Sequence, residues 1–226
     1  MSFFYFFGIF LNTLLTLEGN YCYIIGNKRY LSKGGNFLAP TERFTEEILM
    51  DCAFEMVRES GIDSVNARDL AKELGCSTKP IFRLFSSMDD LKYALYERAG
   101  NLYNERMFQG LQESSFLGMG LAYINFAREE KKLFELLFLS NKYKISSFSD
   151  LLNDVENQGI IAIISKLTGL TQTSARSLFI DIWLTAHGIA TMCATNTCDL
   201  DSSEIEDILK NVFEGVKQKL LNGENK

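Results

Sequence analysis

Proline is scarce in this chain: two prolines occur in 226 residues, and one of them, Pro80, falls inside a stretch that otherwise reads as a short helix. So few prolines leave few breaks for a β-rich meander, and apolar residues recur at three- and four-residue steps along most of the sequence. We therefore predict an all-α fold. A chain of 226 residues that is 46% hydrophobic can bury a sizeable core in one or two compact domains.

Catalytic and metal-binding motifs are also missing. The sequence has no glycine-rich phosphate loop, no HExxH and no G-x-S-x-G, and its single histidine, His187, has no nucleophile and acid at a recognisable spacing. We therefore expect no enzyme activity. The five cysteines are scattered and lack the paired spacing of a zinc site, so we expect reduced thiols in a cytoplasmic protein with no metal and no cofactor.

A basic charge balance is absent as well. The formal net charge is −6 at pH 7, so any contact with nucleic acid must come from a local patch and not from the whole chain. Taken alone, this balance is mild evidence against DNA binding.

Residues 1–38 are the most apolar part of the chain. They lack the positive start and cleavage site of a signal peptide, and as a membrane span they are short and broken by Asn12, Thr13 and Glu18. The Lys-Gly-Gly-Asn at 33–36, near the end of this segment, is what a purine-rich ribosome-binding sequence would encode, which favours a natural start near Leu38. We expect no membrane partner, and a membrane-tethered protein stays open as an alternative.

The first helical segment after this extension has clear signals at both ends. Thr45, followed by two glutamates, predicts a helix start, and Gly61 predicts its end. Its apolar positions predict one buried stripe, which consists of Ile48, Leu49, Cys52, Ala53, Met56 and Val57.

Two shorter helical segments follow. Asn66 is placed to cap the first, which Gly75 ends, and Ser77 or Thr78 is placed to cap the second, which runs to Phe85. Pro80 fits the first turn of that helix, where its missing N–H interrupts no intrahelical bond. Two short helices joined by a tight glycine-containing turn, with a longer helix in front, form helix-turn-helix geometry.

The last of these helices has two opposite faces. One is an apolar stripe that we expect to pack inward, made of Ile81, Leu84 and Phe85. The other is a stripe of two cations, an aromatic ring and a hydroxyl, made of Lys79, Phe82, Arg83 and Ser86. Such a row suits a DNA groove, because the cations can reach phosphates or guanine edges and the ring can contact a thymine methyl.

This stretch resembles the DNA-binding domain of TetR/AcrR-type transcriptional regulators. The matching residues are Gly61, NARDLAKELGCS across the second helix and the turn, IFRLF in the third helix, and Asp89-Asp90-Leu91 at the start of a fourth. The resemblance implies a three-helix DNA-binding domain at 39–98, joined by a long helix to a helical ligand-binding and dimerisation domain at 99–226. The DNA contacts that it implies are Arg43, Thr45, Asn66, Arg68, Ser77, Thr78, Lys79, Phe82, Arg83 and Lys92.

Three positions depart from the common family pattern. Phe82 stands where a phosphate-binding tyrosine is usual, Leu84 where histidine is common, and Met88 where a lysine often opens the fourth helix. Residues 41–100 also carry 8 Lys and Arg against 12 Asp and Glu, a net formal charge of −4. A helical protein whose reading head no longer binds DNA, acting as a ligand-binding protein or anti-repressor, therefore stays open as an alternative.

The remaining residues predict helices around an apolar interior. The segment 173–197 is apolar almost all round, which indicates a buried helix or one shared with a partner subunit. Its Trp183, His187 and Gly188 resemble the Trp-His-Gly signature of one C-terminal subclass of the same family. A lone histidine on an apolar helix is more often a core residue, but the resemblance implies an effector cavity lined by Phe126, Phe134, Leu137, Phe138, Phe179, Trp183 and His187.

The last two predicted helices, 173–197 and 204–221, are a pair that two copies of the chain can combine into a four-helix bundle. The sequence and the resemblance together predict a homodimeric repressor on a pseudo-palindromic double-stranded operator. A small apolar or amphipathic effector is expected to release it, with the fourth helix, from Asp89 towards Phe108, coupling cavity to reading head.

Overall fold

The computed structural model describes residues 45–140, 152–153, 155–197 and 200–224, with side chains at all of these except 111–116 and 155–156. Within these ranges the protein is all-α, with about nine helices, 86% of residues helical and no strands. The all-α prediction is confirmed. Segment 1–38 and Arg43, to which we assigned a start-site hypothesis and a phosphate contact, lie outside the described residues.

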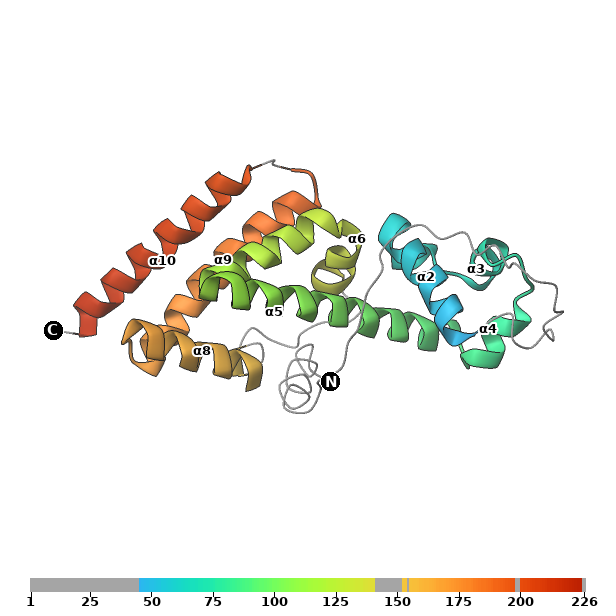
Figure 1. The fold of residues 1–226 in the computed structure, drawn as a ribbon, viewed down its shortest axis with the longest axis horizontal. Helices are drawn as coiled ribbons and strands as arrows, with labels where there is room; N and C mark the ends of the chain where they lie inside the picture. The colour runs from blue at the N-terminus through green and yellow to red at the C-terminus, as the bar shows by residue number, and fades with distance from the viewer. Residues whose placement is uncertain (1–44, 141–151, 154, 198–199, 225–226) are drawn as a thin grey trace.

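Three helices gather at one end of the elongated molecule (Figure 1). They are α2 (Glu46–Ser60), α3 (Ala67–Glu73) and α4 (Lys79–Leu84), with a short 3₁₀ turn, η1 (Ile62–Ser64), after α2. The Thr45 hydroxyl accepts a hydrogen bond from the Ile48 amide as the predicted N-cap, and Gly61 ends α2 at φ 84°, a backbone angle that favours glycine.

The buried face of α2 is rotated from the predicted stripe. Leu49, Ala53 and Val57 are buried as expected, but Ile48 is exposed and Phe54 is buried. Positions 49, 53 and 57 define a line one helical turn apart, and Phe54 lies on the inner side of that line while Ile48 lies on the outer side. The inclusion of Ile48 in the stripe was therefore wrong, and Phe54 was missed.

The long helical element α5 (Met88–Glu129) folds back on itself within its own range. A Cβ built on Gly110 would lie 2.6 Å from the Gly118 carbonyl oxygen and 2.6 Å from the Ala122 Cβ. Residues 8 and 12 positions apart lie about 12 and 18 Å apart along a straight helix, so the chain reverses between 110 and 118. We call residues 88–110 the first arm and residues 118–129 the second arm.

Two short elements follow the second arm. They are α6 (Lys131–Phe134) and a π-helical turn, η2 (Glu135–Leu139). The sequence 129–140 therefore does not form one straight helix, because the backbone of Glu130, at φ −119° and ψ 52°, separates α5 from α6.

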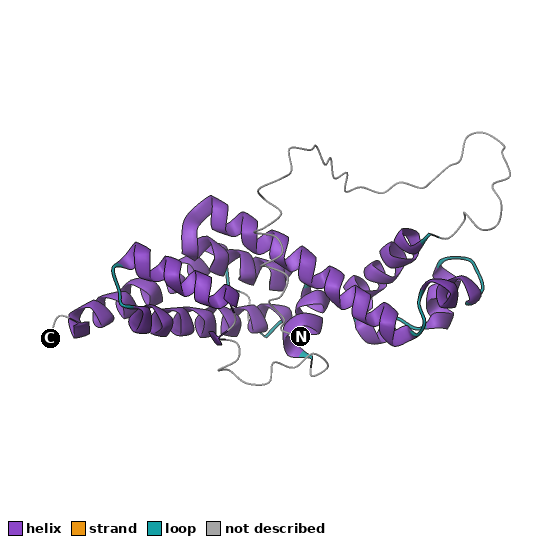
Figure 2. Ribbon diagram, turned by 90° about the horizontal axis from the view of Figure 1, so that it is seen from below, coloured by secondary structure: helices purple, strands orange, loops and turns teal. Residues whose placement is uncertain are grey.

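The last three helices are α8 (Val155–Thr168), α9 (Gln172–Ala194) and α10 (Ser202–Glu224), of which α9 and α10 pack against α5 and α8 packs against α9. Figure 2 shows the described elements as helices joined by loops. By length and composition α9 could cross a membrane, yet it packs against α5, α8 and α10. One apolar core runs without a break from α2 through α5 and α6 to the second half of α9, and a smaller one joins α8, the first half of α9 and α10.

Candidate nucleic-acid interface and ligand sites

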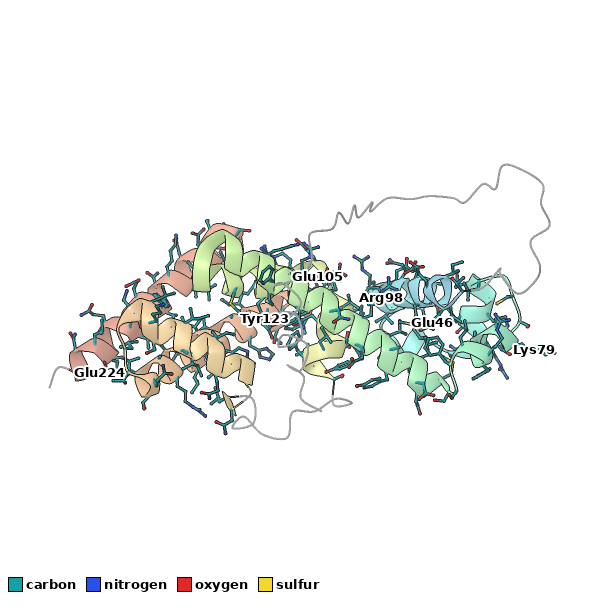
Figure 3. All side chains as sticks on the ribbon, turned by 60° about the horizontal axis from the view of Figure 1, so that its bottom comes forward. Glu46, Lys79, Arg98, Glu105, Tyr123 and Glu224 are labelled. Carbon is teal, nitrogen blue, oxygen red and sulfur yellow. The ribbon has the colours of Figure 1, made fainter. Side chains whose placement is uncertain are left out.

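The two faces of α4 are divided as the sequence predicts. Ile81 is 0% exposed and Leu84 and Phe85 are half-buried, whereas Phe82 is 50% exposed. The exposed stripe carries the predicted reading residues Lys79, Phe82, Arg83 and Ser86. Figure 3 shows Lys79 at the outer end of the helical group formed by α2, α3 and α4. A row of two cations and an aromatic ring therefore faces away from the core.

The start of α4 differs from the prediction in one respect. Thr78 occupies the N-cap position, but its backbone is already helical, at φ −69° and ψ −13°, and its side chain makes no capping bond. Neither Ser77 nor Thr78 therefore acts as the expected side-chain cap. Pro80 lies in the first turn of α4, as predicted, because that turn needs no N–H from this position.

The turn between α3 and α4 depends on Gly75. Gly75 has φ 62°, and the Cys76 amide donates back to the Ala71 carbonyl at 2.9 Å while the Gly75 amide donates to the Lys72 carbonyl at 3.1 Å. This is the helix-ending motif that prefers glycine in the left-handed region. It sets the path from α3 into α4.

Asn66 caps α3 with its full hydrogen-bonding capacity. Its Oδ1 accepts from the Arg68 amide at 3.1 Å and the Asp69 amide at 3.0 Å, and its Nδ2 donates to the Ser64 carbonyl at 3.3 Å and the Asp69 carboxylate at 2.6 Å. An amide has two donors and one oxygen with two lone pairs, so the predicted phosphate contact would have to compete with bonds already made. Arg68, next to it, is exposed.

The other predicted contacts lie near helix ends. Thr45 is an exposed N-cap, Ser77 is exposed in the turn before α4, and Lys92 is half-buried just after the first turn of α5. Ser87, which the sequence analysis did not single out, caps α5 by accepting from the Asp90 amide at 3.1 Å. The signal for it was a serine three residues before an aspartate at a helix start.

The predicted effector residues come together only in part. Phe126, Phe134 and Leu137 are buried, and Phe138 packs on Phe134 with ring centroids 4.8 Å apart. Trp183 stacks on His187 at 5.0 Å and 6°. Phe179 belongs instead to the smaller core beside α8 and α10.

Two tyrosines that the sequence analysis missed complete this aromatic group. Tyr123 lies between Phe134, Phe138 and His187, and Tyr103 packs edge-on against Tyr123, with ring centroids 6.0 Å apart. Both come from α5, one from each arm, so their proximity depends on the reversal of the chain. The signal that could have found it is the stretch 110–120, which holds three glycines and two serines.

The polar end of the aromatic group is a contact between Tyr123 and His187. The Tyr123 hydroxyl lies 2.8 Å from the His187 Nδ1, and it donates there when the ring proton sits on Nε2. Burial raises the pKa of Tyr123 well above its usual value and lowers the pKa of His187. Burial therefore favours the neutral form of each side chain.

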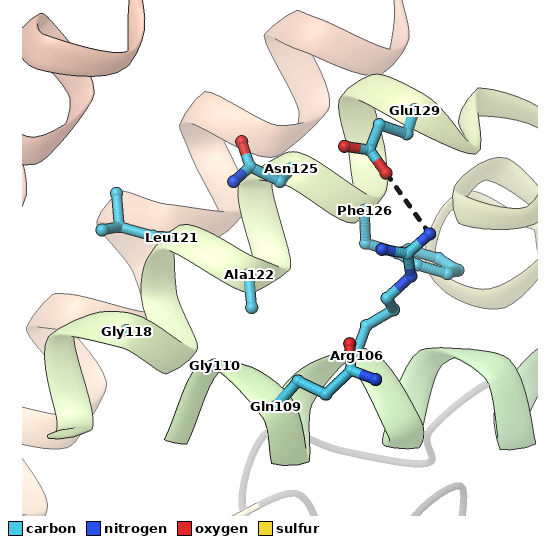
Figure 4. Close-up of a pocket in the computed structure, with 9 residues that line it drawn as sticks. All are labelled: Arg106, Gln109, Gly110, Gly118, Leu121, Ala122, Asn125, Phe126 and Glu129. Atoms are coloured by element: carbon cyan, nitrogen blue, oxygen red, sulfur yellow. Dashed lines mark ion pairs between the residues drawn. The ribbon is translucent and has the colours of Figure 1, made fainter. Parts of the chain in front are cut away.

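A pocket of about 290 Å³ lies between the two arms of α5 (Figure 4). Its polar lining residues are Arg106, Gln109, Asn125 and Glu129, and its apolar ones include Leu121, Ala122 and Phe126. Arg106 rises from the first arm beside the Phe126 ring, and its Nη2 lies 3.5 Å from the Glu129 Oε2 on the second arm. Of the predicted effector residues, only Phe126 lines this pocket.

Within the part of the chain that the structure describes, two ion pairs join α2 to other helices. Arg58, in the last turn of α2, binds the buried carboxylate of Glu130 through two nitrogens, with Nε 2.9 Å from Oε2 and Nη2 in contact with Oε1. Asp51 accepts from Arg98 of α5 at 2.6 Å, and that guanidinium also covers the Phe54 ring at 4.7 Å. These contacts join the helical group of α2, α3 and α4 to α5 and α6.

No protein-family model matches this chain, and no curated protein sequence matches it. The resemblance to TetR/AcrR-type regulators therefore rests on the residues quoted from the sequence, and the DNA and effector contacts that it implies stay predictions.

Proposed function

We propose that this protein is a ligand-responsive DNA-binding transcriptional regulator. The observation that carries the proposal is the division of α4 into a buried apolar side at Ile81 and an exposed side with Lys79, Phe82 and Arg83. A recognition helix needs this division, because one side anchors it and the other enters the major groove. The order of a longer α2, a short α3, the turn at Gly75 and a short α4 is the order of a helix-turn-helix unit, which supports the proposal.

The proposed regulator acts as a homodimer through α9 and α10. The apolar side of α10 packs within its own chain, with Ile205 and Leu209 buried, while Leu184 of α9 is 50% exposed. One exposed leucine is ordinary on a protein surface, so the assignment is supported instead by the apolar composition of α9 and the amphipathic pattern of α10. A two-fold dimer presents two copies of α4 to half-sites about 10 base pairs apart.

Repression released by a small effector is the proposed mode of action. The arms of α5 connect the aromatic group and the pocket with the base of the α2, α3 and α4 group, where Arg58 binds Glu130. A ligand that binds one arrangement of the arms better than another shifts the population of that arrangement. The shift reaches α4 through α5 and through the Arg58 ion pair.

Selection of bound duplexes from a random DNA pool tests the proposal without knowledge of the operator. We expect enrichment of a two-fold symmetric motif with half-sites about one helical turn apart. Recovery of unenriched DNA by a folded protein would support the alternative, a ligand-binding helical protein whose reading head does not bind DNA.

A further inference from the structure

Four polar side chains line the pocket between the arms of α5 and also reach solvent. They are Arg106, Gln109, Asn125 and Glu129, all exposed, and none of them forms a hydrogen bond with another group of the described residues. Arg106 and Glu129 do form an ion pair, but their nearest atoms are 3.5 Å apart. Charge-assisted hydrogen bonds are about 2.7–2.9 Å long, so this ion pair is too long to be one.

Two other exposed ion pairs of the protein are at hydrogen-bonding distance. Lys132 and Glu135 approach to 2.8 Å, and Arg98 and Asp51 to 2.6 Å, at similar solvent exposure. Arg106 and Glu129 are thus farther apart than these two pairs. Arg106 comes from the first arm and Glu129 from the second, so the pair spans the pocket.

The spacing of the arms is fixed beside the pocket. Gly110 and Gly118 both line it, and the absence of a side chain on Gly110 lets the arms meet there at contact distance. One turn before Gly110, Arg106 and the Phe126 ring occupy the space between the arms (Figure 4). The pocket is thus bounded by backbone at one end and by an ion pair at the other.

The charges of the pocket select the class of ligand. One guanidinium and one carboxylate face it, so a simple anion can pair only with Arg106 and a simple cation only with Glu129. A zwitterion satisfies both. The two amides, Gln109 and Asn125, each offer donors and an acceptor, which match another primary amide by paired hydrogen bonds. A volume of about 290 Å³ is at the small end of ligand pockets and admits a small metabolite.

We propose that this pocket binds a free α-amino acid with an amide side chain, with the ligand carboxylate on Arg106, the ligand ammonium on Glu129 and the ligand amide against Asn125 and Gln109. This ligand belongs to a different class from the apolar effector predicted from the sequence. Binding does not depend on the proposed function, whereas any effect of the ligand on DNA rests on it. The path for such an effect is short, because Glu130, next to Glu129, holds Arg58 of α2.

Isothermal titration calorimetry with L-glutamine on the full chain tests the site. A ligand of this size is expected to bind one site per chain with a Kd on the order of 0.1 mM. Two analogues test the charge match: 4-aminobutanamide lacks the carboxylate and glutaramate lacks the ammonium. We expect each to bind at least roughly tenfold more weakly than glutamine.

Matched variants distinguish the pocket from the surface in general. Glu129→Gln and Arg106→Gln are each expected to weaken glutamine binding at least roughly tenfold. The control is Glu135→Gln, because Glu135 is 56% exposed in an ion pair, as is Glu129. It should bind glutamine like the unaltered protein. Circular dichroism and melting temperature establish that each variant is folded.

No heat of binding with glutamine at about 10 mM would overturn the proposal. It would also be overturned if the two singly charged analogues bound as tightly as glutamine, or if Glu135→Gln weakened glutamine binding as much as Glu129→Gln and Arg106→Gln do. None of these outcomes bears on DNA binding, which is measured in the absence of ligand. Failure of the site and failure of the proposed function are therefore distinguishable.

Discussion

Arg58 at the end of α2 and Glu130 at the start of α6 form a two-point ion pair across 72 positions of sequence. The carboxylate is buried, at 7% exposure, while the guanidinium reaches solvent. The side-chain hydrogen bond to Glu130 raises the pKa of the Arg58 guanidinium. The group formed by α2, α3 and α4 is thus attached at its base by a directional contact in addition to apolar packing.

Glu130→Gln is expected to destabilise the protein by about 1–2 kcal/mol, because a buried partner of Arg58 loses its charge while the arginine keeps part of its hydration. Urea denaturation followed by circular dichroism measures the change. Glu55→Gln is the control, since Glu55 also pairs with Arg58 but is 59% exposed, and it should cost less than about 0.5 kcal/mol. Equal losses in the two variants would mean that the buried pair has no special weight.

Gly110→Ala is expected to destabilise the protein by about 1–3 kcal/mol, because the new methyl would lie 2.6 Å from backbone of the second arm and the arms would have to separate. Gly100 lies in the same helix, and a Cβ at that position would meet nothing within 4 Å, so Gly100→Ala should stabilise by about 0.5–1 kcal/mol. Opposite signs in thermal denaturation are the expected result. A neutral Gly110→Ala would contradict the close approach of the arms.

Stability should fall on acidification in a way that depends on His187. Burial lowers the pKa of His187 below its usual 6.5, so the unfolded chain binds the proton more tightly than the folded protein. The stabilising contribution is therefore present above pH 6.5 and is lost as pH falls through the lowered folded pKa. Tyr123 stays neutral throughout, because burial raises its pKa.

The melting temperature measured between pH about 7.5 and 5.5 checks this dependence, above the range where carboxylates titrate. His187 is the single histidine of the chain, so His187→Asn should remove most of the pH dependence within this window. A variant with the same pH profile as the unaltered protein would assign the effect to other groups.

Phe82 and Ile81 are neighbours in α4 that should behave in opposite ways. Ile81 is 0% exposed, so Ile81→Ala should cost about 2–5 kcal/mol of stability. Phe82 is 50% exposed, so Phe82→Ala should change stability by less than about 0.5 kcal/mol and weaken DNA binding roughly tenfold. Denaturation and DNA binding measured on both variants give the comparison. Loss of stability at Phe82 without loss of binding would assign the ring to the core.

The local features of the fold were predictable because their causes are local. The cap at Thr45, the cap at Asn66, the turn at Gly75 and the two faces of α4 all follow from residues within one or two helical turns. The all-α class follows from periodicity along the whole chain.

The tertiary features were not predictable, since they depend on residues far apart in sequence. The pocket and the Tyr103–Tyr123 contact both require the reversal between the arms of α5, and nothing near Gly110 or Gly118 indicates its direction. Phe179 was assigned to the effector group on the family resemblance, but it lies on the part of α9 that packs beside α8 and α10.

Fluorescence anisotropy with the intergenic duplex upstream of the gene, across a salt series, tests the central claim most directly. The protein should bind at low salt with an affinity that falls steeply as salt rises. Arg83→Ala should lose roughly tenfold in discrimination between this duplex and a scrambled one, and Lys79→Ala should weaken both alike. No change in anisotropy at low salt with folded protein would contradict the account, and equal losses in the two variants would show that α4 does not read DNA through Arg83.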